Sequence, residues 1–328
     1  MEALLAEQRN FSTQVLQLFG EWQNIQIQGK LKEIQTIFDQ KNLSTIFSRE
    51  ESYNILVRTQ QKHRLLVLVA PPRVSLTCSS SLQHDLPIEL PEKLKVFLNE
   101  HYPIDSDVCP VEFYGDYFLR PIGDADIRQL QTILSPISTV VLHSNISDCE
   151  VYFHVSFWNP QSNNIVKLSM PPWNWEEARE SLSSSFGSEV KSIRVIRQII
   201  ASVYQLLAAF ITDWYYLNIN PKYEPCLFRL DAHAFSGYSS GFTSDWIQPY
   251  ISTLKRLHLQ QLKAYEKEIE RLSNEAERRR LTSLVSSVEQ FSTYEEYLKW
   301  SSNKNRGSYT PFTKEAFYRS LRYSGQSK

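Results

Sequence analysis

Apolar residues form helix-like stripes near both ends of the chain. In the N-terminal stripe they recur at intervals of mostly three and four residues, with a phase shift near Gly29. A second stripe begins near Asp245, with Pro249 in its first turn, and consists of Ile247, Ile251, Leu254, His258, Leu262, Tyr265, Ile269, Leu272 and Ala276. This spacing predicts amphipathic helices, and the heptad-like second stripe is typical of a coiled coil.

The middle of the chain instead alternates short apolar runs with helical patterns. The predicted strands are 65–70, 111–118, 139–143 and 150–158, and the predicted helices are 92–101, opened by Pro91, and 124–134. Strands that alternate with helices predict a parallel sheet with right-handed crossovers. The last strand follows after only a short turn, so it is expected to pair antiparallel. Asn174 then caps a further helix, with Glu177 three residues on.

One stretch, Val195–Leu217, is apolar enough to raise the question of a membrane span. Its unbroken apolar runs fall short of the roughly 20 residues that a span needs, because Arg197, Gln198, Gln205 and Asp213 interrupt them. Small residues occupy the face opposite its large apolar side chains. We therefore expect a buried central helix and no transmembrane segment.

The distribution of proline divides the chain. No proline precedes Pro71, fourteen lie between Pro71 and Pro249, and only Pro311 follows, so both ends are free to form long helices. The sequence predicts an α/β core, with a small mixed but mainly parallel sheet and crossover helices, flanked by long N- and C-terminal helical arms; the chain is expected to be predominantly helical overall. The expected units are an N-terminal arm 1–62, an α/β core 63–170, a helical part 171–230, a linker 231–245, a C-terminal arm 246–300 and a basic aromatic tail 301–328.

Net charge and cysteine content limit the kinds of partner and the cellular location that fit this chain. The net charge of -1 gives no overall attraction to nucleic acid or anionic lipid, so such a partner would need a local patch. The four cysteines are far apart and no signal-like apolar stretch follows Met1. We therefore expect free thiols and a cytoplasmic location.

The carboxyl ends of the predicted parallel strands are the expected place for a ligand. Arg73 and Arg120 follow two of these ends and are candidate anion-binding residues, although arginines after strands are common on protein surfaces. His143 and His154 lie on adjacent predicted strands and, with Asp124, are the weak catalytic candidates. His154 begins one His-x-Ser pattern, and one imidazole cannot be both general acid and general base. No glycine-rich phosphate loop is present, and no cofactor is expected.

Three acids, Glu112, Asp116 and Asp124, are candidate ligands for a divalent metal. Glu112 and Asp116 would share one face of a strand, but the solvated face of a strand explains the pair equally well. The sequence therefore predicts no metal site.

The C-terminal tail combines basic and aromatic residues. From Ser301 on, six basic residues accompany one acid and five aromatic residues, whereas the span 85–126 holds ten acids and three bases. The candidate partner-binding residues are Arg278, Arg279, Arg280, Lys304, Arg306, Arg319 and Arg322. The tail suits docking on the acidic span, an external protein partner, or nucleic acid or lipid.

These patterns favour a non-enzymatic adaptor or assembly protein, acting on a protein partner or as a homo-oligomer through its helical arms and tail. The alternative is an enzyme that acts on a phosphate-bearing substrate at the carboxyl edge of the sheet. A nucleic-acid-binding accessory protein is the third hypothesis. No motif specifies a reaction, so the balance leans away from an enzyme.

Overall fold

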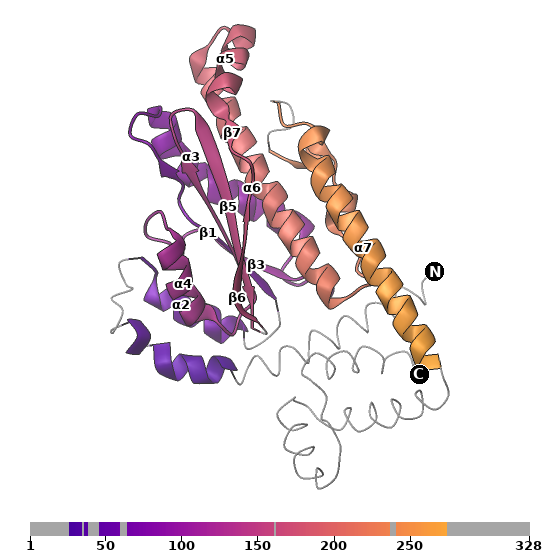
Figure 1. Cartoon of the computed structure of the whole chain (residues 1–328). Helices are drawn as coiled ribbons and strands as arrows, with labels where there is room; N and C mark the ends of the chain where they lie inside the picture. The colour runs from indigo at the N-terminus through magenta and orange to yellow at the C-terminus, as the bar shows by residue number, and fades with distance from the viewer. Residues whose placement is uncertain are drawn as a thin grey trace.

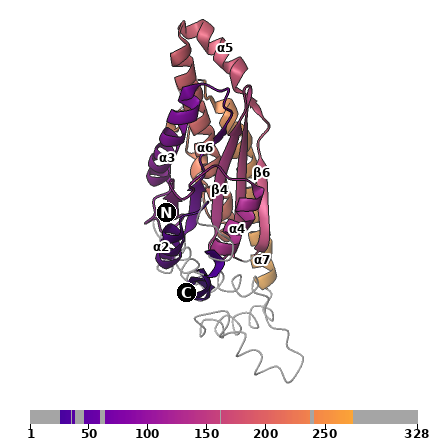
Figure 2. The same cartoon turned by 90° about the vertical axis from the view of Figure 1, so that its left-hand side faces the viewer.

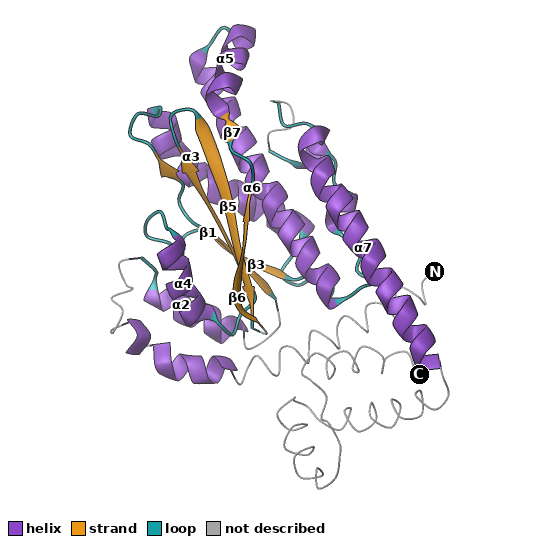
Figure 3. Ribbon diagram, viewed as in Figure 1, coloured by secondary structure: helices purple, strands orange, loops and turns teal. Residues whose placement is uncertain are grey.

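A mixed β-sheet with helices on both faces forms the centre of the protein (Figures 1 and 3). The computed structural model describes residues 26–34, 36–38, 46–59, 64–160, 162–236 and 241–273. Within these ranges the sheet has seven strands, and the predicted α/β class is confirmed.

The sheet has the order β3-β1-β4-β5-β6. Its strands are β1 (Leu65–Val69), β2 (Arg73–Val74), β3 (Val111–Tyr114), β4 (Thr139–Ile146), β5 (Glu150–Asn159), β6 (Ser162–Ser169) and β7 (Trp173–Asn174). The pairs β1–β3, β1–β4 and β2–β4 are parallel, as expected, and β5 adds antiparallel to β4. Because β6 and β7 also pair antiparallel with β5, the described sheet is evenly mixed, and the expectation of a mainly parallel sheet was wrong.

The described helices that follow β1 agree with the sequence-based prediction, except that one of them, α3, begins at a different residue. α4 (Asp124–Leu134) has its predicted bounds, and α5 (Trp175–Phe186) is capped by Asn174, whose side chain accepts from the Glu177 N–H. α3 spans Ser80–His101, so the predicted start at Pro91 was wrong. Ser79 caps it, and buried leucines at every fourth position from Leu82 to Leu94 hold a helix that contains two prolines.

Two apolar clusters lie on opposite faces of the sheet. Side chains alternate along the strands, so Val140, Leu142 and Phe153 face α3 and α6 (Glu189–Ile219), whereas Leu66, Val141 and Trp158 face α2 (Arg49–Thr59) and α4. Figure 1 shows the strands with α2 and α4 on one side and α6 on the other, and Figure 2 shows the same arrangement turned by 90°. The first cluster also includes residues from the predicted helical part and C-terminal arm.

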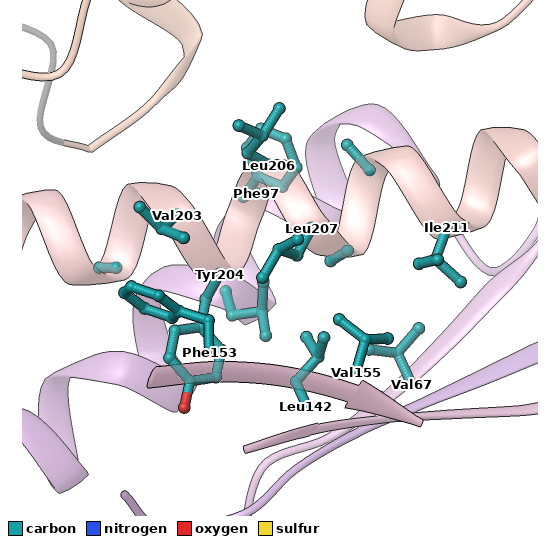
Figure 4. Close-up of a cluster of buried hydrophobic side chains, with 14 of the residues drawn as sticks. Val67, Phe97, Leu142, Phe153, Val155, Val203, Tyr204, Leu206, Leu207 and Ile211 are labelled. Atoms are coloured by element: carbon teal, nitrogen blue, oxygen red, sulfur yellow. The ribbon is translucent and has the colours of Figure 1, made fainter. Parts of the chain in front are cut away.

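α6 is the buried central helix that the sequence predicts. Its side chains, among them Leu207 and Ile211, point toward Leu142 and Val155 on the sheet (Figure 4). By length and composition it is the one helix in the described part of the chain that could span a membrane, yet 83% of its most apolar window is buried inside the protein. Asp213, within this helix, accepts hydrogen bonds from the N–H groups of Cys226 and Leu227 and from the Tyr223 hydroxyl.

The described parts of both arms pack on the core, on opposite faces of the sheet. Helical residues 26–34 and 36–38 place Ile27, Ile34 and Phe38 in the cluster beside α2 and α4. α7 (Ser244–Ser273) runs beside α6 (Figure 1) and buries Ile247 in the other cluster, followed at helical spacing by two more of its stripe residues. The segment predicted as a linker holds two phenylalanines, Phe235 and Phe242, in the same cluster.

Candidate functional site

The two candidate histidines lie side by side. His143 on β4 and His154 on β5 are direct partners in the antiparallel register, which confirms that they are strand neighbours. Their rings stack with centroids 4.9 Å apart and an angle of 29° between planes. Both project toward α4, because the neighbouring residues Phe153 and Val155 belong to the opposite cluster. His143 is only 7% exposed.

Charged and polar groups surround this pair. Asp124, the first residue of α4, forms an ion pair with Lys167 of β6, with 2.7 Å between Oδ2 and Nζ. Nδ1 of His154 lies 3.0 Å from Oγ of Ser169, also on β6. We call His143, His154, Asp124, Lys167 and Ser169 the histidine site. Strand pairing and the start of α4 therefore assemble it from four elements.

The environment lowers the pKa of both imidazoles. Burial, together with the nearby His154, Lys167 and Arg73, lowers the pKa of His143 to about 4, while Asp124 acts in the opposite sense. Burial also lowers the pKa of His154. The hydrogen bond from Lys167 lowers the pKa of Asp124. Among the described groups His143 Nδ1 has no hydrogen-bond partner, so the ring is a buried base with an unused nitrogen.

This chemistry is a poor match to phosphate transfer. A neutral imidazole is a weak anchor for phosphate, and the ammonium of Lys167 is already compensated by Asp124. The hydrogen bond between Ser169 and His154 places a hydroxyl beside a base, as in enzymes with a serine nucleophile. Both residues lie on strands, however, and not in the strand-to-helix turn that exposes such a serine. The histidine site is thus a coupled polar cluster whose groups mainly satisfy one another.

The two candidate anion-binding arginines have different surroundings. Arg73, on β2, is close enough to His143 to affect its pKa. Arg120 instead forms a two-pronged interaction with the Asp126 carboxylate, at 3.1 and 3.3 Å, and donates to the Pro121 carbonyl. Asp126 also accepts from the Gly123 N–H at the start of α4. The Arg120 guanidinium therefore contacts the carboxylate that caps the start of α4. A joint anion site with Arg73 stays a prediction.

The acids weighed as metal ligands do not assemble. Glu112 is buried against the similarly buried Arg64, with 2.5 Å between Oε2 and Nε, and it accepts from the Tyr114 hydroxyl. Burial nonetheless raises the pKa of Glu112. Asp116 is exposed, and Asp124 pairs with Lys167. In the ranges that the structure describes, no three or more His, Cys, Asp or Glu side chains are grouped to hold a metal ion.

The outer edge of β6, which no described strand covers, is a second candidate site that the sequence patterns did not predict. β6 is the last strand in the order and pairs, among described strands, with β5 alone. Val166 and Leu168 project on the α6 side of the sheet with 41% and 39% of their surface exposed. Lys167 is the only charged residue of the strand.

The signal for β6 was present in the sequence but weak. The dipeptide Asn159-Pro160 is a turn signal between two runs that contain β-branched residues, which is a hairpin pattern. Because both faces of β6 are largely exposed, however, its side chains do not show the strict alternation of a half-buried strand. Lys167 and Ser169, which complete the histidine site, were missed for this reason.

The basic residues proposed for partner binding, from Arg278 to Arg322, lie outside the described residues. The acidic span 85–126, on which the tail is suggested to dock, lies within the described residues. Of its ten acids, five form ion pairs with described residues: Asp85, Glu89, Glu112, Asp124 and Asp126. Arg197 of α6 holds two of them, Asp85 and Glu89 of α3, at 2.7 and 3.1 Å. Much of the acidic charge is thus compensated within the core.

Comparison of the chain with protein-family models, with curated proteins and with solved structures finds no match.

Proposed function

We propose that this protein is a non-enzymatic adaptor or assembly protein. The observation that carries the proposal is the open β6 edge, where half-exposed apolar side chains accompany a strand with one charge. Natural proteins commonly protect edge strands with uncompensated charges, prolines or covering segments. No strand in the described part of the chain pairs with the outer edge of β6, and such an edge is suited to receive a further strand by β-augmentation.

The state of the polar groups in the core supports binding in preference to catalysis. Arg120, Lys167 and Arg197 each hold acids of their own chain. The pKa of each imidazole is lowered, which favours the neutral ring, and His143 is buried. The ion pairs stabilise and orient the elements of the fold, and among these groups His143 Nδ1 keeps no hydrogen-bond partner in the described part of the chain.

The helical arms and the basic aromatic tail belong to the same proposal. α7 buries the first part of its stripe on the core, but Leu259 farther along the helix is 59% exposed. In sequence the stripe continues to Ala276 and is followed by Arg278, Arg279 and Arg280. We infer that the distal part of this arm and the tail contact a protein partner, with tyrosine and arginine as the favoured anchors.

Association of the purified full chain tests this proposal. Light scattering after size-exclusion chromatography measures self-association, and a tagged chain retrieves partners. Two variants alter the proposed surfaces: Val166→Lys on β6, and a tail variant with Lys304, Arg306, Arg319 and Arg322 changed to Gln. The control is Val190→Lys, because Val190 is a valine 81% exposed on α6. We expect association that at least one surface variant abolishes and the control retains; a strict monomer that retrieves no partner contradicts the proposal.

One observation favours the enzyme alternative as a second candidate. Arg73, Asp124, His143 and His154 are electrostatically coupled, so four of the five residues proposed for that chemistry lie near one another. Inorganic phosphate is the simplest probe. If this site accepts a phosphate group, millimolar phosphate shifts the imidazole NMR signals of His154 in the wild type and not in Arg73→Gln. No shift at low salt removes this candidate.

Nucleic-acid binding through Arg278–Arg280 and the tail is the third hypothesis. It predicts binding that weakens steeply as salt rises, because each phosphate contact releases counterions. Fluorescence anisotropy with single- and double-stranded oligonucleotides checks it, and the four-Gln tail variant should lower the salt dependence.

A further inference from the structure

We propose that Arg73, Asn145 and His143 form a binding site for a small organic carboxylate. The site goes beyond the proposed adaptor function, because it gives the protein a ligand of its own. Arg73 belongs to β2, and the other two side chains belong to the second half of β4. We assign them a role in binding and none in a reaction.

The strand order places this site where α/β sheets commonly bind ligands. In the order β3-β1-β4, β1 lies between the two longer parallel strands that follow it in the chain. In parallel sheets of this order, ligands bind beyond the carboxyl ends of the first strand and of the later of its two neighbours. Here β1 ends at Val69, shortly before Arg73, and β4 ends at Ile146.

The strand register brings the three side chains to one face of the sheet. Arg73 is the direct partner of Asn145, and paired residues of neighbouring strands project to the same side. His143 lies two residues before Asn145 on β4, so it projects to that side as well. Val74 packs on the cluster of the opposite face, in agreement with this alternation. Besides burial, the charge of Arg73 contributes to the lowered pKa of His143, so the two groups lie within electrostatic range.

All three side chains have hydrogen-bonding groups that the described part of the chain leaves unused. Neither Arg73 nor Asn145 forms an ion pair or a side-chain hydrogen bond with another described residue. His143 is 7% exposed, and its Nδ1 has no partner there either. A guanidinium, an amide nitrogen and an imidazole N–H are donors, so together they fit a ligand that accepts hydrogen bonds. Such a ligand would also remove the cost of an unpaired buried group.

The charges at this face favour a carboxylate over a phosphate group. The ammonium of Lys167 is compensated by its 2.7 Å contact with Asp124. The pKa of His143, about 4, leaves its imidazole neutral at pH 7. One positive charge therefore remains, on Arg73, and it balances the single charge of a carboxylate, whereas a phosphate monoester carries about 1.5 to 2 negative charges. A guanidinium can also hold a carboxylate through two parallel hydrogen bonds.

Titration of the full-length chain with acetate tests the proposal. The side-chain amide signal of Asn145 and the imidazole signals of His143 report on the site by NMR, with chloride keeping the ionic strength constant. We expect saturable shifts in the wild type. Arg73 is exposed, so Arg73→Gln should leave the fold intact, and it should weaken acetate binding about tenfold or more by removing charge-assisted hydrogen bonds.

Two further variants separate a built site from attraction to any positive charge. Arg73→Lys keeps the charge but loses the paired donors of the guanidinium, so it should also weaken acetate binding. Arg194→Gln is the matched control, because Arg194 is an exposed arginine on α6, which covers the opposite face of the sheet. It should bind acetate as the wild type does.

The outcomes also separate this inference from the proposed function. Shifts that stay linear in acetate concentration, or acetate binding that survives Arg73→Gln, overturn the carboxylate site. Tighter binding of inorganic phosphate than of acetate overturns the choice of a carboxylate and supports the phosphate-bearing substrate instead. Association of the chain is measured in acetate-free buffer, so the adaptor proposal and the carboxylate site can each fail while the other stands.

Discussion

Lys167 on the edge strand β6 contacts Asp124 at the first turn of α4, with 2.7 Å between nitrogen and oxygen. This ion pair joins the edge of the sheet to the helix that covers the histidine site. Both partners are substantially exposed, so removing the pair should cost less than about 1 kcal/mol of stability. Its larger effect is on the titration of the two histidines.

Opposite shifts are expected when the two partners are removed separately. Lys167 lowers the pKa of both His143 and His154, and Asp124 raises both. Lys167→Met should therefore raise the pKa of His154, and Asp124→Asn should lower it. Titration of the imidazole carbon-bound protons by NMR measures both values. Shifts in the same direction in the two variants would show that the pair does not control this site.

Burial of His143 should make the stability fall in acid. Its pKa is about 4 in the folded protein and about 6.5 in the unfolded chain, so the unfolded state binds more protons between these values. Stability is therefore lost as the pH falls from about 6.5 to about 4, by up to roughly 3 kcal/mol.

The comparison with His143→Gln isolates this contribution. Burial raises the pKa of Asp213 to about 6, so that group acts in the opposite sense over a similar pH range, equally in both proteins. Urea unfolding at a series of pH values should show the stability difference between wild type and variant shrinking or reversing in acid. Parallel curves would mean that His143 titrates normally.

Among the ion pairs of the described residues, the pair between Glu112 and Arg64 is the most deeply buried. Glu112→Ala leaves the Arg64 charge buried and uncompensated, at a cost of about 3–5 kcal/mol. The double variant Arg64→Met and Glu112→Leu should recover most of this loss, because a well-packed apolar pair needs no charge compensation. Denaturant midpoints measure both; a double variant as unstable as Glu112→Ala would refute the explanation.

Gly115 is required for the contact between β3 and α3. A Cβ atom at this position would lie 2.6 Å from Cβ of Pro91, closer than two carbon atoms can pack. Gly115→Ala should therefore cost about 1–3 kcal/mol. The matched control is Gly29→Ala, which has open space in a helix and should stabilise by about 0.5–1 kcal/mol. Thermal unfolding of the two variants shows whether their effects differ in sign.

Several elements could be predicted because local and tertiary signals agree in them. β1 is an uninterrupted apolar run, α4 begins with acids at its first turn, and α6 carries large apolar side chains along a long stretch. The stacked histidines were also placed on adjacent strands, since only a short turn separates β4 from β5.

The remaining elements depend on contacts that the local sequence does not encode. Pro87 and Pro91 indicate a break in α3, but burial of its leucines against α6 and the sheet outweighs the lost hydrogen bonds. β6 lacks a buried face, so its sequence does not show the alternation of apolar and polar residues that identifies a strand. The role of Lys167 follows only once β6 lies beside β5, and the candidate site was therefore half predicted.

The position of α6 in the sequence sets the order in which the protein can fold during synthesis. Every described strand is translated before α6, which covers one face of the sheet. A nascent chain that has completed β7 thus presents Leu142, Phe153 and Val155 with α3 on their face of the sheet but without α6, together with the outer edge of β6. Because domains fold as units once their parts are available, the sheet must wait for α6, and chaperone contact during this interval would protect it from aggregation.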